Sequence, residues 1–280
     1  MAIYWRDLWQ QVAVDYGGEV LNGVATGGSV VTLADTSALA AYADDWWEKG
    51  WVYMLSGAAI GQIRLITTLA ANTLTFPALT APVVAGDTYF LWTGRPKNDL
   101  VRAAMSALQA AFPAFYKVTQ DSTLVVIADT RDYTLPVTVQ HIIRVEQGFD
   151  ETPDHYVEVE DWRQDGRTLR LKRGNYLEIG ALIRITWAAP IAVPATDATL
   201  VDIDIAWEND LLKFVGAYGA MLLNLRSFPR EAALMREHTT LISMIRSELL
   251  GSVRRMPQFP GRTIWAEDPL GWTVTHNWHS

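Results

Sequence analysis

The sequence predicts an α+β protein: a helical bundle with an inserted antiparallel β domain, a small N-terminal β barrel or sandwich module, and an extended C-terminal arm. Three observations lead to this prediction. Short β-prone runs separated by glycine-rich turns fill the first third of the chain. Helical periodicity follows Gly94 and returns after Pro194, on either side of a second β-prone block. The final stretch is rich in proline and glycine, yet it keeps its tryptophans.

Residues 1–95 are expected to form the N-terminal module. A leading helix is indicated by apolar residues at helical spacing, namely Tyr4, Trp5, Leu8, Trp9 and Val12. Glycines then interrupt the chain, and strands are expected over 30–33, 51–55, 62–67, 73–76 and 88–92. A further helix is expected over 37–47, opening at a cap formed by Asp35 or Thr36.

Residues 96–251 are expected to form the helical bundle, with the β domain inserted at about 123–187. Its first helix begins at an Asn98 cap and ends at Pro113. The inserted strands are expected over 123–128, 139–146, 156–160, 168–172 and 182–187. Two amphipathic helices, over 205–225 and 229–249, complete the bundle as an antiparallel pair.

Residues 252–280 are expected to form the extended arm. A freely disordered tail is poor in aromatic residues, but this one keeps Trp265, Trp272 and Trp278. We therefore expect the arm to dock through these tryptophans, on its own body or on a neighbour. In the preceding bundle, Gly216 and Gly219 flank Tyr218 and would let another backbone approach closely, as an interface. The alternative, two tolerated glycines on a tightly packed helix, fits equally well.

Composition narrows the function classes. The absence of cysteine excludes disulfides, thiolate catalysis and cysteine-based metal sites. A formal charge of −8 disfavours a protein that grips nucleic acid, because that class carries a basic patch. The longest apolar stretch, 211–225, is shorter than the ~20 residues that span a bilayer, and residues 1–11 do not resemble a secretory signal. The 12 tryptophans and 10 tyrosines favour self-association or a large partner surface.

The search for reactive chemistry indicates that the chain is not an enzyme and needs no cofactor or metal. None of the common nucleophile, phosphate-binding or zinc motifs occurs. Glu158 and Glu160 share one strand face and could act as an acid–base pair, but a solvated strand face is the favoured interpretation. His276 and His279 lack a third ligand nearby in the sequence. Asp202 and Asp204 are expected to cap the helix that starts near Ile205.

Two stretches carry a resemblance. The first, Asp44–Trp92, has a tryptophan-glycine entry, a Ser-Gly-x-x-x-Gly turn and a closing Gly-Asp-Thr-Tyr strand, at Trp47/Gly50, Ser56/Gly57/Gly61 and Gly86/Asp87/Thr88/Tyr89. It is similar to a small β module recurrent in tailed-phage structural proteins. The second is the order of a helix, RDYTLP (131–136), strands with VEDWR and GRTLRL, and a helix with GAYGAMLL. That order resembles the tubular adaptor family of podoviruses and related siphoviruses.

The resemblance implies a structural virion protein. Members of that family form a ring, usually a dodecamer, that sits under the portal and joins it to the tail. The expected partners are therefore further copies of the chain, the portal protein, and tail or neck proteins. DNA would pass through the lumen without specific binding, and no membrane is involved. The expected location is the neck of the virion, at the head–tail junction, after synthesis in the host cytoplasm.

Three alternatives remain open. Another neck, tail or baseplate protein of the same kind of virion fits the sequence almost as well. A carbohydrate-binding module would need exposed tryptophans that stack on sugars, from among Trp5, Trp9, Trp46, Trp47 and Trp51. A hydrolase would have to rely on Glu158 and Glu160 without a supporting nucleophile or metal set.

Overall fold

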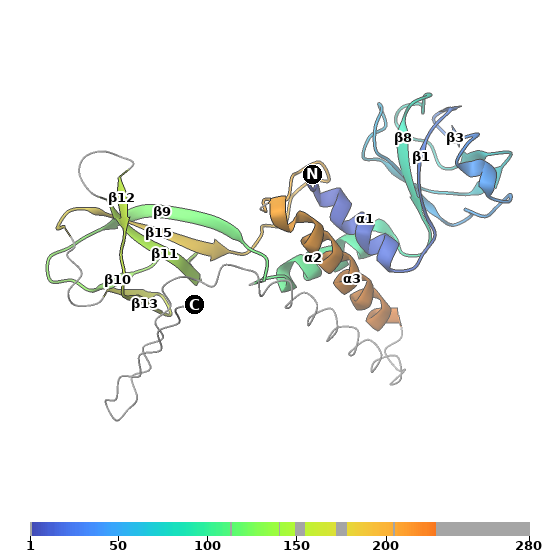
Figure 1. The fold of residues 1–280 in the computed structure, drawn as a ribbon. Coiled ribbons are helices and arrows are strands. Elements are labelled where there is room, and N and C mark those ends of the chain that lie inside the picture. Colours follow the sequence, from blue (N-terminus) through green and yellow to red (C-terminus); the bar gives the residue numbers. More distant parts are fainter. Residues whose placement is uncertain are drawn as a thin grey trace. The chain divides into compact units, whose positions relative to one another are not determined.

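The computed structural model describes residues 2–112, 114–139, 141–148, 155–171, 178–203 and 205–227. These residues divide into two compact units, each of which is described by itself (Figure 1). Unit 1 takes in the described parts of 1–111, 192–201 and 205–247, and unit 2 takes in those of 112–191 and 202–204.

The β part of unit 1 consists of two four-stranded antiparallel sheets. Their orders are β1-β8-β4-β5 and β2-β3-β7-β6. The strands and one short 3-10 helix are β1 (Val20–Val24), β2 (Gly27–Gly28), β3 (Thr32–Ala34), η1 (Leu39–Ala41), β4 (Trp51–Met54), β5 (Ile63–Leu65), β6 (Thr68–Ala70), β7 (Thr73–Thr75) and β8 (Thr88–Trp92). Side chains of both sheets, such as Leu33, Leu74 and Met54, share one buried core. The sheets therefore stabilise each other through a common hydrophobic interior.

The sheet that contains β4 and β8 is covered on both faces. Along β8, Tyr89 and Leu91 point into the core shared by the two sheets. The alternate residues, Phe90 and Trp92, lie instead against Trp9, with ring centroids 6.2 and 5.7 Å from it. This alternation follows from the two-residue period of a strand, and it explains why nearly all of β8 is buried.

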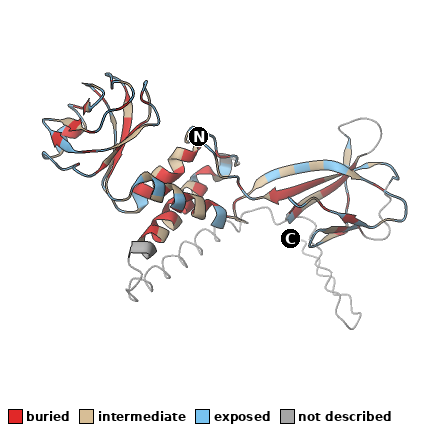
Figure 2. Ribbon diagram, turned by 180° about the vertical axis from the view of Figure 1, so that it is seen from behind, coloured by how far each residue is buried: buried red, intermediate tan, exposed pale blue. Residues whose placement is uncertain are grey.

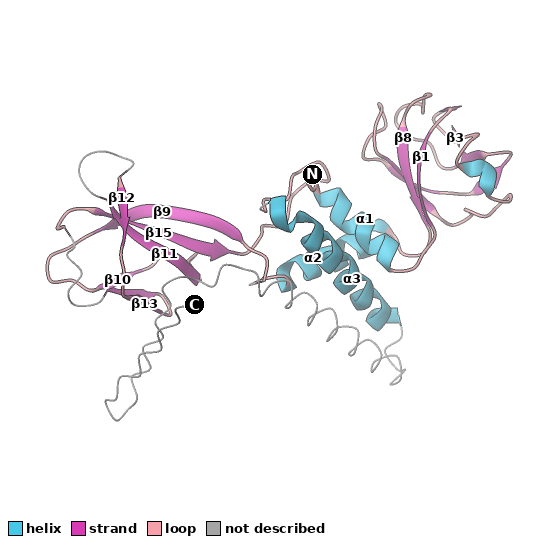
Figure 3. Ribbon diagram, viewed as in Figure 1, coloured by secondary structure: helices cyan, strands magenta, loops and turns pink. Residues whose placement is uncertain are grey.

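Three helices pack together in unit 1: α1 (Trp5–Asp15), α2 (Lys97–Ala110) and α3 (Glu208–Ser227), the last preceded by the short η2 (Ile205–Trp207) (Figure 3). Helix α1 buries the stripe that its sequence predicts, including Leu8, Trp9 and Val12. Its first turn is stabilised by the Asp7 carboxylate, which accepts a 2.8 Å hydrogen bond from the backbone N–H of Tyr4. None of the described helices combines the length and apolar composition that a membrane span requires.

Unit 2 is built from seven strands in two antiparallel sheets. Their orders are β12-β11-β15-β9 and β10-β14-β13. The strands are β9 (Lys117–Val125), β10 (Asp132–Thr134), β11 (His141–Gly148), β12 (Tyr156–Glu158), β13 (Trp162–Asp165), β14 (Thr168–Leu171) and β15 (Leu182–Ala189). Apolar residues of both sheets, such as Val145, Leu169 and Ile185, form one core. A tight hairpin through Gly166 joins β13 to β14, with Asp165 paired to Thr168.

The prediction of a helical bundle that carries an inserted β domain is wrong. The described residues contain three α-helices, against fifteen strands in four antiparallel sheets, so this part of the chain is mostly β (Figure 3). Many of these strands are only two to four residues long. Hydrophobic periodicity detects such short strands poorly, so the longer helical patterns received too much weight in the prediction.

Other expectations can also be compared with the described residues. The helix predicted over 37–47 is wrong, because only Leu39–Ala41 form one 3-10 turn. Asp45 and Lys49 have φ values of 60° and 67°, which break any helical path through this segment. Asp35 does cap the turn, since its Oδ1 accepts hydrogen bonds from the backbone N–H groups of Ser37 and Ala38. The predicted helix over 229–249 and the predicted arm over 252–280 lie outside the described residues.

Candidate functional site

The glycines proposed as an interface lie on α3, where α1 packs against it. A Cβ atom on Gly219 would lie 2.6 Å from Cγ2 of Val12. A Cβ atom on Gly216 would lie 2.3 Å from Oδ2 of Asp15 and 2.6 Å from Cγ of Gln11. Both glycines therefore face side chains of a helix of the same chain, and their use as an interface with another chain stays a prediction.

The other predicted interface residues are placed differently. Tyr218 is half-buried and stacks on Phe214, with ring centroids 5.5 Å apart and an interplanar angle of 19°. Trp265, Trp272 and Trp278 lie outside the described residues. An interface between subunits through any of these residues stays a prediction.

Replacing Gly219 with alanine is expected to lower the free energy of unfolding by up to about 2 kcal/mol. Val12 is β-branched and cannot move aside, so α1 must shift, at a cost of about 1–3 kcal/mol that the better helix propensity of alanine offsets by about 1 kcal/mol. Gly216→Ala meets the flexible side chains of Gln11 and Asp15, so its effect should be near zero. Urea unfolding measures both variants. Equal losses would contradict the packing explanation.

Most of the described tryptophans belong to the core. Trp5, Trp9 and Trp47 are at most 4% exposed, and Trp51 stacks on Trp92 at 6.3 Å. The carbohydrate-binding alternative, which requires exposed tryptophans, therefore fails at three of its five positions. Only Trp46, at 55% exposure, presents an open ring. The abundance of tryptophan thus reflects interior packing in the described residues, and it no longer argues for a partner surface there.

A cluster of four side chains joins separate elements of unit 1 around Asp197. The carboxylate of Asp197 accepts hydrogen bonds from Trp9 Nε1 (3.1 Å) and from the Tyr53 hydroxyl (3.0 Å). It also forms an ion pair with Lys97, whose ammonium lies 5.0 and 4.9 Å from the ring centroids of Trp9 and Tyr53. Burial, and then the nearby Asp197 carboxylate, raise the pKa of Tyr53, so its hydroxyl remains a donor. No motif in the sequence predicted this Asp197 cluster.

The acidic residues proposed for chemistry lie on the surface of unit 2. Glu158, at the end of β12, and Glu160 are both exposed. Asp202 pairs with Lys117, a role that the capping prediction missed. Among the described residues, no group of three or more histidine, aspartate or glutamate side chains could hold a metal ion. His276 and His279 lie outside the described residues.

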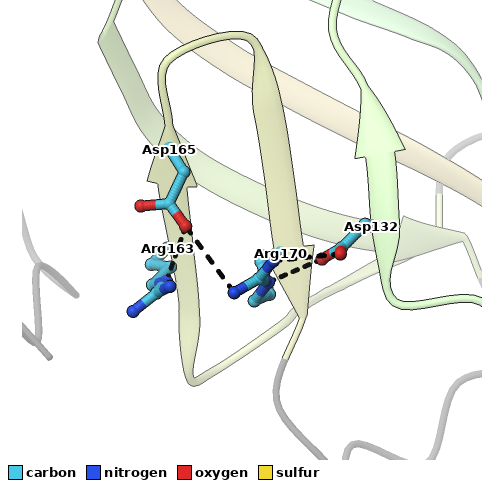
Figure 4. Close-up of polar contacts among 4 residues, drawn as sticks. All are labelled: Asp132, Arg163, Asp165 and Arg170. Carbon is cyan, nitrogen blue, oxygen red and sulfur yellow. Dashed lines mark hydrogen bonds and ion pairs between the residues drawn. The ribbon is translucent and has the colours of Figure 1, made fainter. Parts of the chain in front are cut away.

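Charged side chains form a network on the outer face of the three-stranded sheet of unit 2 (Figure 4). Arg170 on β14 donates two hydrogen bonds to Asp132 on β10, at 2.7 and 3.1 Å. Asp165 on β13 pairs with Arg163 at 2.8 Å and approaches Arg170 at 3.9 Å. The hydrogen bonds from Arg170 lower the pKa of Asp132. Each carboxylate here is matched by a guanidinium, so the network joins the strands and does not present a bare charge to a ligand.

Apolar side chains are exposed at one end of the larger sheet of unit 2. Strand β9 forms an edge of that sheet, and none of its nine residues is buried (Figure 2). Its last residue, Val125, pairs with Leu182, and Val126 exchanges backbone hydrogen bonds with Gly180 and Ala181. We call the exposed apolar residues of these two paired segments the tip patch: Val125 (41% exposed), Ile127 (59%), Ile179 (71%) and Leu182 (44%).

An open groove of about 420 Å³ lies in unit 1 between α1 and the edge strand β1. Helix α1 contributes Arg6, Asp7 and Gln10 to its wall. The sheet contributes Asn22, Gly23 and Val24 from β1, with Leu55, Thr88 and Tyr89. The glycine runs around β1 were interpreted as chain breaks, so the sequence did not reveal this groove.

Comparisons with known protein families, with curated proteins and with solved structures found no match.

Proposed function

We propose that this chain is a structural subunit of a tailed-phage virion, which assembles with further copies into a ring that connects the portal to the tail. The proposal is supported by the resemblance of Asp44–Trp92 and of the RDYTLP-to-GAYGAMLL order to phage neck proteins. Its role is to hold other proteins together, and catalysis has no part in it. Other neck, tail and baseplate positions are the nearest alternatives.

The tip patch is the observation that carries this proposal. Four aliphatic side chains, between 41% and 71% exposed, gather where β9 and β15 end. Beside them, β9 offers an edge whose only charged residues are Lys117 and Asp121. Soluble proteins usually protect such an edge, because its free backbone groups pair with other chains. An apolar patch beside an open edge is typical of a surface that another protein covers.

The charge of the chain suits a conduit that DNA passes through. Each copy carries a formal charge of −8, and a ring repeats that charge around its axis. Phosphates would be repelled and not retained, so DNA could slide past without specific binding. A lumen lined mainly by lysine and arginine in the assembled ring would contradict this part of the proposal.

The decisive experiment is native mass spectrometry combined with negative-stain imaging, on the chain alone and mixed with a portal ring. Rings in either sample support the connector function. Rings that bind isolated tail structures but not the portal would favour another neck or tail position. A monomer that ignores both structures would overturn the proposal.

Charges placed in the tip patch are expected to prevent assembly. The double variant Ile127→Asp/Ile179→Asp should weaken ring formation roughly tenfold or more, because each carboxylate would have to lose its water at the interface. Its unfolding midpoint should stay near that of the parent chain, since both side chains are exposed. Ile60→Asp is the matched control, because Ile60 is 57% exposed but lies in unit 1. Equal assembly by the double variant and the control would exclude the tip patch as the interface.

A further inference from the structure

Strand β1, which lines the groove together with residues of β8, has a free backbone edge. Ala25 N–H donates to Asp87 C=O at 2.8 Å, and Thr93 N–H donates to Glu19 C=O at 2.9 Å. In an antiparallel pair, the backbone N–H and C=O groups of successive residues point alternately toward and away from the neighbouring strand. The backbone groups of the odd-numbered residues of β1 therefore point toward β8. The N–H and C=O groups of Val20, Asn22 and Val24 therefore point away from β8. Within the described part of the chain, no strand pairs with that side of β1.

The opposite wall supplies a hydrogen-bond donor without a partner. Gln10 lies on α1, and its Nε2 atom is buried and makes no hydrogen bond. A buried amide donor of this kind costs about 1–3 kcal/mol unless an acceptor reaches it. The neighbouring Asp7 is already engaged by the backbone N–H of Tyr4. An extended peptide beside β1 would give partners to the free backbone groups of that strand, next to the groove in whose wall the unpaired Gln10 amide lies.

The side chains of the groove also suit an extended segment. Asn22 and Val24 lie on the same sheet face as Phe90, the face that α1 partly covers. Val24 is 52% exposed, and Leu55 lies near it in the groove wall. A peptide strand directs alternate side chains to one face, so one or two of them would rest on Val24 and Leu55. The volume of about 420 Å³ matches a short segment, not a folded domain.

We propose that this groove binds residues 272–278 from a second copy of the chain, as an added strand beside β1. The segment Trp-Thr-Val-Thr-His-Asn-Trp is free of proline, and its three central β-branched residues favour an extended conformation. The described chain ends at Ser227, and residues 228–271 can reach on the order of 100 Å when partly extended, enough to enter an adjacent subunit. This choice of a second copy rests on the self-association proposed above.

Cysteine cross-linking tests the proposal directly, because the chain contains no cysteine of its own. One full-length chain carries Asn22→Cys and another carries Thr275→Cys, with Val274→Cys as the variant for the other strand face. Mixed and mildly oxidised, they should form a disulfide-linked heterodimer. Leu65→Cys is the matched control, because β5 is the opposite edge of the same sheet and Leu65 is 40% exposed. The Asn22 pair should cross-link on the order of tenfold more than the control pair.

Two further variants distinguish specific binding at the groove from non-specific association between chains. Val24→Pro removes only an outward-facing N–H, which an edge strand tolerates, and Gln10→Leu removes the unpaired donor. Both should keep the fold and lower cross-linking severalfold. Cross-linking that does not exceed the Leu65 control overturns the proposal. A link that forms only inside a chain carrying both cysteines also overturns it, in favour of the chain's own segment. Native mass spectrometry on the same samples shows whether rings form. The groove proposal can therefore be rejected independently of the ring proposal.

Discussion

Replacing Asp197 with alanine is expected to lower the free energy of unfolding by about 3–5 kcal/mol. The substitution removes the acceptor of Trp9 Nε1 and of the Tyr53 hydroxyl, and it leaves the Lys97 ammonium, only 18% exposed, without its counter-ion. A largely buried charge without a partner is among the most costly defects that a single substitution creates. Urea unfolding followed by tryptophan fluorescence measures the loss, because Trp9 itself lies in the cluster.

Asp202→Ala is the matched control for this prediction. It also breaks an aspartate–lysine pair, with Lys117, but the two side chains are 68% and 43% exposed. An exposed pair of this kind contributes about 0–1 kcal/mol, so the control should be nearly neutral. Asp197→Asn, which keeps an acceptor but removes the charge, should fall between the two. An Asp197→Ala variant as stable as Asp202→Ala would mean that Lys97 finds another partner or reaches water.

The elements that the sequence predicted well are those whose signals are local. The strand predicted over 88–92 coincides with β8, and that over 51–55 exceeds β4 by one residue. Both alternate strictly between two covered faces and are bounded by turn residues. The helix after Gly94 was also predicted, although it begins after Pro96 and not at an Asn98 cap. Proline at the start of a helix needs no donor and presets the backbone, so this boundary was readable in principle.

The candidate sites depend on contacts that no sequence window contains. Asp197 is separated from Lys97 by 100 positions in the sequence and from Trp9 by 188, so only folding brings these side chains into contact. The glycines of α3 were recognised as sites of close approach, but their partner, Val12, is equally remote in sequence. The number of tryptophans suggested a partner surface, but most of the described tryptophans are buried in the core. Residue type thus indicates what a side chain can do, while topology decides what it meets.

Strand β1 illustrates how glycine misled the prediction. Gly23 was interpreted as a break in the chain, yet it lies inside β1 and pairs with Tyr89. A Cβ atom there would lie 2.2 Å from the Tyr89 hydroxyl and 2.8 Å from Oδ2 of Asp35. Asp35 is fully buried, and it accepts a 2.7 Å hydrogen bond from that hydroxyl. Glycine is therefore present because a buried polar pair occupies the space that a side chain would need.

Gly23→Ala is accordingly expected to destabilise the chain by about 2–6 kcal/mol. The added methyl group forces Tyr89 aside, at about 1–3 kcal/mol for overpacking, and the displaced hydroxyl leaves Asp35 short of a donor, at about 1–3 kcal/mol more. Gly27→Ala is the control, since Gly27 also lies in a strand and a Cβ there meets nothing within 4 Å. Urea midpoints compare the two variants, and the control should be neutral or slightly more stable.

The cause of the loss at Gly23 can be isolated with Tyr89→Phe. If displacement of the hydroxyl carries much of the cost, Gly23→Ala should cost less in a Tyr89→Phe background, because the hydrogen bond to Asp35 is already absent. The two substitutions would then be non-additive by about 1–2 kcal/mol. Strict additivity would place the whole cost in the overlap with the ring, whose Cζ lies 2.3 Å from the new Cβ. In that case Asp35 would be satisfied by Ser37 and Ala38 alone, which donate to its other oxygen.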